Sequence, residues 1–208
     1  MSVESPEYEV LRREGSLELR RYLPYLTASV KVRSAGYNEA AYASFGLLAD
    51  YIFGNNVDAG SIPMTAPVTA SRSSGTKIAM TAPVTSERVR NDRLESASPL
   101  CTVHCAGEYV VRFTMPSSFA SVEDLPEPND HRVSLEAVPA HLAAVARFSG
   151  RLSDEAVAKA LEQLEEWMGR EGLVAAGEPE VAQYDAPWKP GFVRRNEVLV
   201  PVEGPART

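Results

Sequence analysis

The chain contains few of the residues from which metal sites and disulfide frameworks are built. Its 208 residues include only 2 cysteines and 3 histidines. Both cysteines lie in the string CTVHC, at residues 101–105. A structural zinc site usually needs four ligands in two pairs, so we expect no metal here. Cys101 and Cys105 are interpreted as reduced; the alternative is a local disulfide, which requires that this segment forms a loop. The low cysteine count predicts a cytoplasmic protein.

Long apolar runs and catalytic signatures are also absent. The most apolar stretch, residues 40–53, is too short and too interrupted by polar residues to span a bilayer. The first residues show no secretory signal. The chain has no G-x-S-x-G elbow, no H-E-x-x-H motif and no phosphate-binding glycine loop. These absences predict a protein that is neither an enzyme nor embedded in a membrane.

The chain has fewer basic than acidic residues. The chain has 28 acidic and 21 basic residues, which gives a net charge of −7. This balance argues against nucleic acid and against an anionic membrane as main partners, because both need a basic face. The hydrophobic share of 44% and the charged share of 24% are ordinary for globular proteins. A core of normal size is therefore expected.

The order of the predicted elements repeats once along the chain. Strand-like runs occur at residues 8–12, 17–32, 109–115, 133–148, 180–184 and 193–202. Helices are predicted at 38–53 and from Ser153 to Gly169 or Gly172. We interpret this order as two copies of strand–strand–helix–strand–strand. The prediction is one domain, residues 1–208, with an internal duplication of about 7–116 and 131–203.

One octet of sequence occurs twice. Residues 62–69 read IPMTAPVT and residues 78–85 read IAMTAPVT, with a polar, glycine-bearing connection between them. Alternating side chains and this connection predict a hairpin of two strands. Because proline cannot donate to a ladder, we expect bent or edge strands. Met64 and Met80 would then either line a site or fill the core.

The two predicted helices differ in their apolar surface. The second has an ordinary amphipathic pattern, whereas the first, residues 38–53, is apolar nearly all round. One stripe, containing Phe45 and Leu48, suffices to pack on a sheet. The other apolar face must meet the loop at about 87–105, a second subunit, or a flat apolar ligand.

Basic residues return near the end of the chain, in PWKPGFVRRNEVLV. On a strand, Arg194 and Arg195 would point to opposite faces. One arginine would be held by an acid inside the fold, and the other would reach solvent or an anionic ligand. Lys189, between prolines, would be placed to fix a carboxylate.

Three stretches of the sequence resemble the SOUL/haem-binding protein family: PEYEVLRREGSLELRRY, KIAMTAPVT and APWKPGFVRRNEVLV. The resemblance runs from about residue 7 to residue 202. It implies an α+β fold in which duplicated β-α-β-β units form a distorted antiparallel β-barrel flanked by two helices, similar to gyrase-inhibitor-like effector-binding domains. It also implies binding of haem or another tetrapyrrole against the first helix, without an invariant histidine ligand.

The resemblance also indicates which residues would contact the ligand. The expected cofactor-binding residues, the two octet methionines included, are Tyr42, Phe45, Ala49, Asp50, Met64, Met80 and Lys189. Family binders can carry bases where this chain has Tyr42 and Asp50. An exposed acid would repel a haem propionate by about 1 kcal/mol or less, whereas a tyrosine can donate a hydrogen bond to it or approach the iron.

These expectations define two candidate functions. The first is a non-enzymatic carrier or buffer of haem, acting as a monomer or weak homo-oligomer. The alternative is an interaction module, or a module for another small molecule, that keeps the fold and no longer binds haem.

Overall fold

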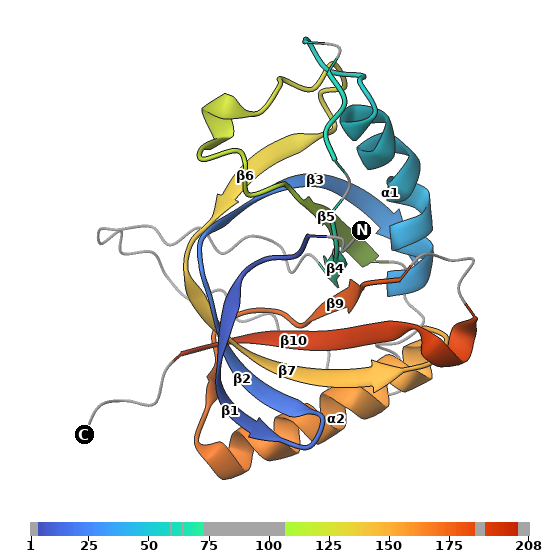
Figure 1. Ribbon diagram of the computed structural model, residues 1–208. Coiled ribbons are helices and arrows are strands. Elements are labelled where there is room, and N and C mark those ends of the chain that lie inside the picture. The colour runs from blue at the N-terminus through green and yellow to red at the C-terminus, as the bar shows by residue number, and fades with distance from the viewer. Residues whose placement is uncertain (1–3, 59, 64, 73–106, 186–189, 204–208) are drawn as a thin grey trace, which may run out of the picture.

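The fold combines one antiparallel sheet with two α-helices (Figure 1). The computed structural model describes residues 4–58, 60–63, 65–72, 107–185 and 190–203. Within them the sheet has 10 strands. The predicted α+β class is confirmed.

The elements follow the predicted order closely. The first half contains β1 (Tyr8–Glu14), β2 (Leu17–Tyr22), β3 (Tyr25–Ser34), α1 (Tyr37–Ile52), β4 (Val68–Arg72) and β5 (Gly107–Thr114). The second half contains η2 (Val122–Asp124), β6 (Ser134–Val138), β7 (His141–Ser149), α2 (Asp154–Glu171), β8 (Val174–Ala175), β9 (Glu180–Gln183), η3 (Gly191–Val193) and β10 (Arg195–Glu203).

The strand order shows how the two halves of the chain combine. It reads β1-β2-β7-β10-β9-β4-β5-β3-β6, with β8 paired to β10 outside this path. The units β3-α1-β4-β5 and β7-α2-β9-β10 meet where β4 pairs with β9. β2, which precedes the first unit, pairs with β7 of the second, where Tyr22 is opposite His141. β6, which precedes the second unit, pairs with β3 of the first, where Val138 is opposite Tyr25. The two halves therefore interlock.

The sheet is curved but open. Its two ends, β1 and β6, have no strand neighbour on their outer sides within the described residues. The expected barrel is therefore incomplete, although the strands bend around a central space (Figure 1).

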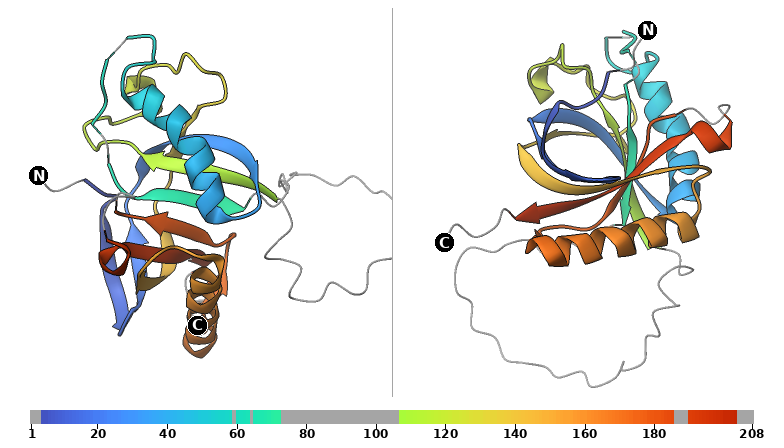
Figure 2. Two further views of the ribbon diagram at one scale, coloured as in Figure 1. Left: turned by 90° about the vertical axis from the view of Figure 1, so that its right-hand side faces the viewer. Right: turned by 60° about the horizontal axis from the view of Figure 1, so that its bottom comes forward.

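Each helix covers one half of the sheet, as Figure 2 shows. Leu48 and Ile52 of α1 pack against Val30 and Val111 of the first half. A second cluster packs Leu164 and Trp167 of α2 against the other half; its strand members include Ala144, Val181, Val198 and Val200. The predicted cap of α2 is confirmed, because the Ser153 hydroxyl accepts a hydrogen bond of 3.2 Å from the amide of Ala156.

The doubled octet is only partly described, and the predicted edge position is wrong for the end of its first copy. Residues 78–85 and Met64 lie outside the described residues, whereas Val68 and Thr69 begin β4. Both edges of β4 are taken, by β5 and β9. These two residues therefore occupy a central strand and cannot pair with the second octet. Pro67 is compatible with this because it lies just before the strand, where no ladder N–H is needed.

Candidate functional site

The outer face of α1 presents aromatic side chains to solvent. Tyr42 is 59% exposed, Phe45 38%, and Phe53, directly after the helix, 64%. The opposite face of the helix is closed: Leu48 and Ile52 are at most 1% exposed. The predicted surplus of apolar surface on this helix is thus present in the structure.

The buried face of α1 is rotated from the predicted stripe. Ser44 lies on the buried face, and its hydroxyl donates a 2.9 Å hydrogen bond to the carbonyl of Ala40. Phe45, expected to pack centrally, lies at the border, with its ring centroid 5.5 Å from that of Phe113. A serine that satisfies its own hydroxyl permits close helix–sheet contact, which a hydrophobicity pattern does not register.

The predicted cofactor-binding residues differ in exposure, and some of them lie outside the described residues. Tyr42, Phe45 and Asp50 are exposed on α1. Ala49 is buried, at 8% exposure, and its contact with a ring stays a prediction. The carboxylate of Asp50 accepts a 2.6 Å hydrogen bond from Asn55. Met64, Met80 and Lys189 lie outside the described residues, as do Cys101, His104 and Cys105.

The charge on α1 is acidic where a haem propionate would need a base. The helix carries Glu39 and Asp50 and no lysine or arginine. Outside this helix, the turn η3 also exposes apolar side chains: Phe192 is 79% exposed and Val193 52%. The helix face therefore fits an apolar ring better than an anionic group.

A buried ionic network joins β2, β7 and β10. Arg20 donates to Glu18 at 2.7 Å and to both carboxylate oxygens of Glu197 at 2.8 and 3.0 Å. Arg147 also donates to Glu18, at 3.0 Å. Burial alone would raise the pKa of Glu18, but these hydrogen bonds outweigh it and hold that pKa below its usual range.

The network also holds two tyrosines. Tyr22 accepts a 3.0 Å hydrogen bond from Arg20, and Tyr184 donates one of 2.6 Å to Glu197. Burial raises the pKa of Tyr184, so its hydroxyl keeps its proton. The sequence predicted this role for Arg194 or Arg195, but the arginine held by buried acids here is Arg20. Arg195 instead lies with its guanidinium 3.7 Å from the ring centroid of Tyr184.

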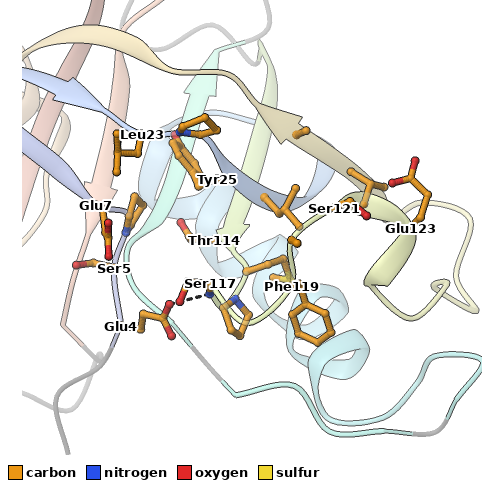
Figure 3. A pocket seen from close by; sticks show the side chains of 18 residues that line it. Glu4, Ser5, Glu7, Leu23, Tyr25, Thr114, Ser117, Phe119, Ser121 and Glu123 are labelled. Atoms are coloured by element: carbon orange, nitrogen blue, oxygen red, sulfur yellow. Dashed lines mark hydrogen bonds between the residues drawn. The ribbon is translucent and has the colours of Figure 1, made fainter.

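Two cavities open in the concave side of the sheet. The larger has a volume of about 580 Å³ and is bordered by Glu4, Glu7 and Glu123 (Figure 3). The smaller has a volume of about 330 Å³. Ser5, Pro6, Tyr25, Thr114 and Ala137 line both, so the two cavities adjoin each other. We call the two together the inner cleft, and it was not predicted from the sequence.

The family of the chain follows from its sequence. The sequence model of the SOUL heme-binding protein family matches residues 3–75 and 70–201. The chain belongs to this family. No curated protein matched the sequence of this SOUL protein.

Solved structures share the SOUL protein's fold at low sequence identity. The C-terminal domain of EcmrR is 12% identical, with a TM-score of 0.59 over 94% of this chain and 98% of that one. A hydrolase from Listeria innocua is 11% identical, with a TM-score of 0.58 over 93% and 94%. An uncharacterized conserved protein from the same organism is 13% identical, with a TM-score of 0.56 over 89% and 92%. These likenesses show the fold alone.

The described residues also bear on the expected absence of a metal site and of a membrane-spanning helix. Across the described residues, no group of three or more histidine, cysteine, aspartate or glutamate side chains is arranged to hold a metal ion. Neither α1 nor α2 is long and apolar enough to cross a membrane.

Proposed function

We propose that this SOUL protein binds haem or another tetrapyrrole on the outer face of α1, as a carrier or buffer rather than an enzyme. The carrying observation is the exposure of Tyr42, Phe45 and Phe53 on a helix whose other face is closed by the core. Exposed aromatic side chains gathered in this way mark interaction sites more often than solvated surface. The family supports a tetrapyrrole as the occupant.

Apolar contact would supply most of the binding energy. Covering about 200 Å² of apolar surface contributes about 5 kcal/mol at 25 cal/mol per Å², before the cost of immobilising the ligand. Charge adds little, because α1 has no base for a propionate and Asp50 is acidic. The hydroxyl of Tyr42 is the group that would donate a hydrogen bond to a propionate.

The iron would have no histidine from α1, because the sequence of this helix contains none. Lys189, Met64 and Met80 stay predictions for the same site.

Titration of the purified protein with haemin tests the proposal. We expect a saturable Soret change in the wild type that is lost in Phe45→Glu and in Tyr42→Glu. Leu11→Glu is the matched control, because Leu11 is as exposed as Phe45, at 38%, but lies on β1. Equal Soret changes in all four proteins, or a wild-type spectrum equal to that of an unrelated control protein, would reject the site.

A second titration tests the mode of binding. Because the helix offers no base, we expect mesoporphyrin and its dimethyl ester to bind within about threefold of each other, a difference under 1 kcal/mol. A much weaker ester would mean that charges outside the described residues hold the propionates.

The alternative function uses the same surface. If α1 instead buries its outer face in a partner subunit, Phe45→Glu lowers the molecular mass measured by light scattering and leaves haemin uptake absent in every variant. A monomer or weak homo-oligomer, and a cytoplasmic location, stay predictions.

A further inference from the structure

The inner cleft lies apart from α1 and has a chemistry of its own. None of the residues that line its two cavities belongs to α1. We propose that it is a second ligand site, which takes an aromatic organic monocation with Glu180 as its counter-ion.

The charges that line the inner cleft select a cation. Glu4, Glu7 and Glu123 border the larger cavity, and Glu136 and Glu180 line the smaller one. Against these five carboxylates the described lining offers the Arg112 guanidinium and the His141 imidazole. A haem with two ionised propionates would meet repulsion here, so the inner cleft and α1 favour different ligands.

Glu180 has unused capacity to hold a cation. Arg112 lies 3.6 Å from Glu180 and 3.9 Å from Glu136, and it donates its 3.0 Å hydrogen bond to Ser71 instead. Within the described part of the chain, no group donates a hydrogen bond to either carboxylate. One guanidinium shared by two carboxylates leaves a net charge of about −1 at this position.

Burial makes this unused charge costly without a ligand. The side chain of Glu180 keeps only 26% of its surface accessible. Burial raises the pKa of Glu180 above its ordinary value, although Arg112 and His141 oppose the shift. A bound cation would remove that cost by pairing with the carboxylate.

The aromatic side chains of the smaller cavity are held in place. Tyr8, Tyr22, Tyr25, Tyr184 and His141 all line it. Tyr22 and Tyr184 are fixed through their hydroxyls by the Arg20–Glu197 pair. The ring of His141 stacks on that of Tyr22, with centroids 5.2 Å apart and 12° between the planes. Rigid π faces beside a carboxylate suit a flat cation, since cation–π contact adds to the ion pair.

The volume of the inner cleft also suits such a ligand. The smaller cavity, about 330 Å³, falls within the usual range for small-molecule sites, and it adjoins the larger one of about 580 Å³. Leu23, Leu26, Phe119 and Val122 make much of the larger cavity apolar.

Fluorescence titration with acridine orange, a flat aromatic monocation, tests the proposal. We expect saturable binding to the wild type, weakened about tenfold or more by Glu180→Gln and by a smaller factor by Glu136→Gln. Glu162→Gln, on the exposed face of α2, is the matched control and should bind as the wild type does. The anion 1-anilinonaphthalene-8-sulfonate should not displace the dye.

The outcomes separate this site from the one on α1. Phe45→Glu should leave acridine orange binding intact, and Glu180→Gln should leave haemin binding intact, so either site can fail alone. Equal dye affinity in the wild type, Glu180→Gln and Glu136→Gln would overturn the proposal. So would the absence of dye binding to a wild-type protein that melts cooperatively.

Discussion

The guanidinium of Arg20 forms two hydrogen bonds, of 2.8 and 3.0 Å, with the carboxylate of Glu197. The two residues are 177 positions apart, and neither side chain is more than 3% exposed. They belong to β2 and β10, which are separated in the sheet by β7. The pair therefore links the first and last parts of the chain across an intervening strand.

We predict that Arg20→Met destabilises the protein by about 3–5 kcal/mol, because it leaves Glu18 and Glu197 as buried charges without their main partner. Urea denaturation monitored by circular dichroism measures the loss. Arg21→Met is the matched control: Arg21 pairs with Glu9 at 3.0 Å, but both side chains are more than half exposed, so we expect a loss of about 1 kcal/mol or less. Equal losses for Arg20 and Arg21 would contradict this prediction.

The two faces of α1 should respond differently to truncation. Leu48→Ala should cost about 2–5 kcal/mol because Leu48 is fully buried. Phe45→Ala should cost about 1 kcal/mol, mainly through its contact with Phe113. The same urea denaturation compares them. A loss at Phe45 as large as that at Leu48 would mean that the outer face is core rather than binding surface.

Glu180→Gln should raise the melting temperature at neutral pH. Burial raises the pKa of Glu180 above its ordinary value of 4.5, so the folded state binds the proton more tightly than the unfolded state does. The stability that protonation contributes is complete below pH 4.5 and is lost as the pH rises through the folded-state pKa. The variant's advantage should therefore shrink as the pH falls toward 4.5.

Calorimetry from pH 4.5 to pH 8, with Glu162→Gln as the control, measures this difference. A Glu180→Gln variant less stable than the wild type at neutral pH would show that the carboxylate stabilises the fold. The opposite result, together with lost dye binding, is the pattern expected of a residue retained for ligand binding.

The cap of α2 should contribute measurably to stability. Ser153→Ala removes the acceptor for the amide of Ala156, and we expect a loss of about 1 kcal/mol. Ser149→Ala serves as the comparison, because Ser149 is exposed at the end of β7 and its change should cost about 0.5 kcal/mol or less. If the two losses agree, the cap adds nothing.

Much of the fold was predictable because it follows from local patterns. Alternation identified the strands, Ser153 marked the start of α2, and of the two predicted ends, Gly169 and Gly172, the second is the C-cap. The surplus apolar face of α1 was visible because a helix needs only one stripe to pack. The division into units of about 7–116 and 131–203 stays a prediction.

The inner cleft and the buried network could not be predicted in the same way. Alternation in β2 places Glu18, Arg20 and Tyr22 on one face, but it does not show that Glu197 lies opposite. That partner depends on strands that meet only in the folded sheet. The burial of Ser44 was not predicted either, because a hydrophobicity pattern does not show that a small side chain permits close packing against the sheet.

The exchange of β2 and β6 between the two halves of the sheet has a consequence for folding. β3 pairs with β5 and β6, and β7 pairs with β2 and β10. Each half of the sheet therefore includes one strand whose sequence lies in the other half of the chain. Neither half is a self-sufficient module that can be excised. A chain cleaved between β5 and β6 should stay folded only while its two fragments are associated. Neither fragment should fold before it binds the other.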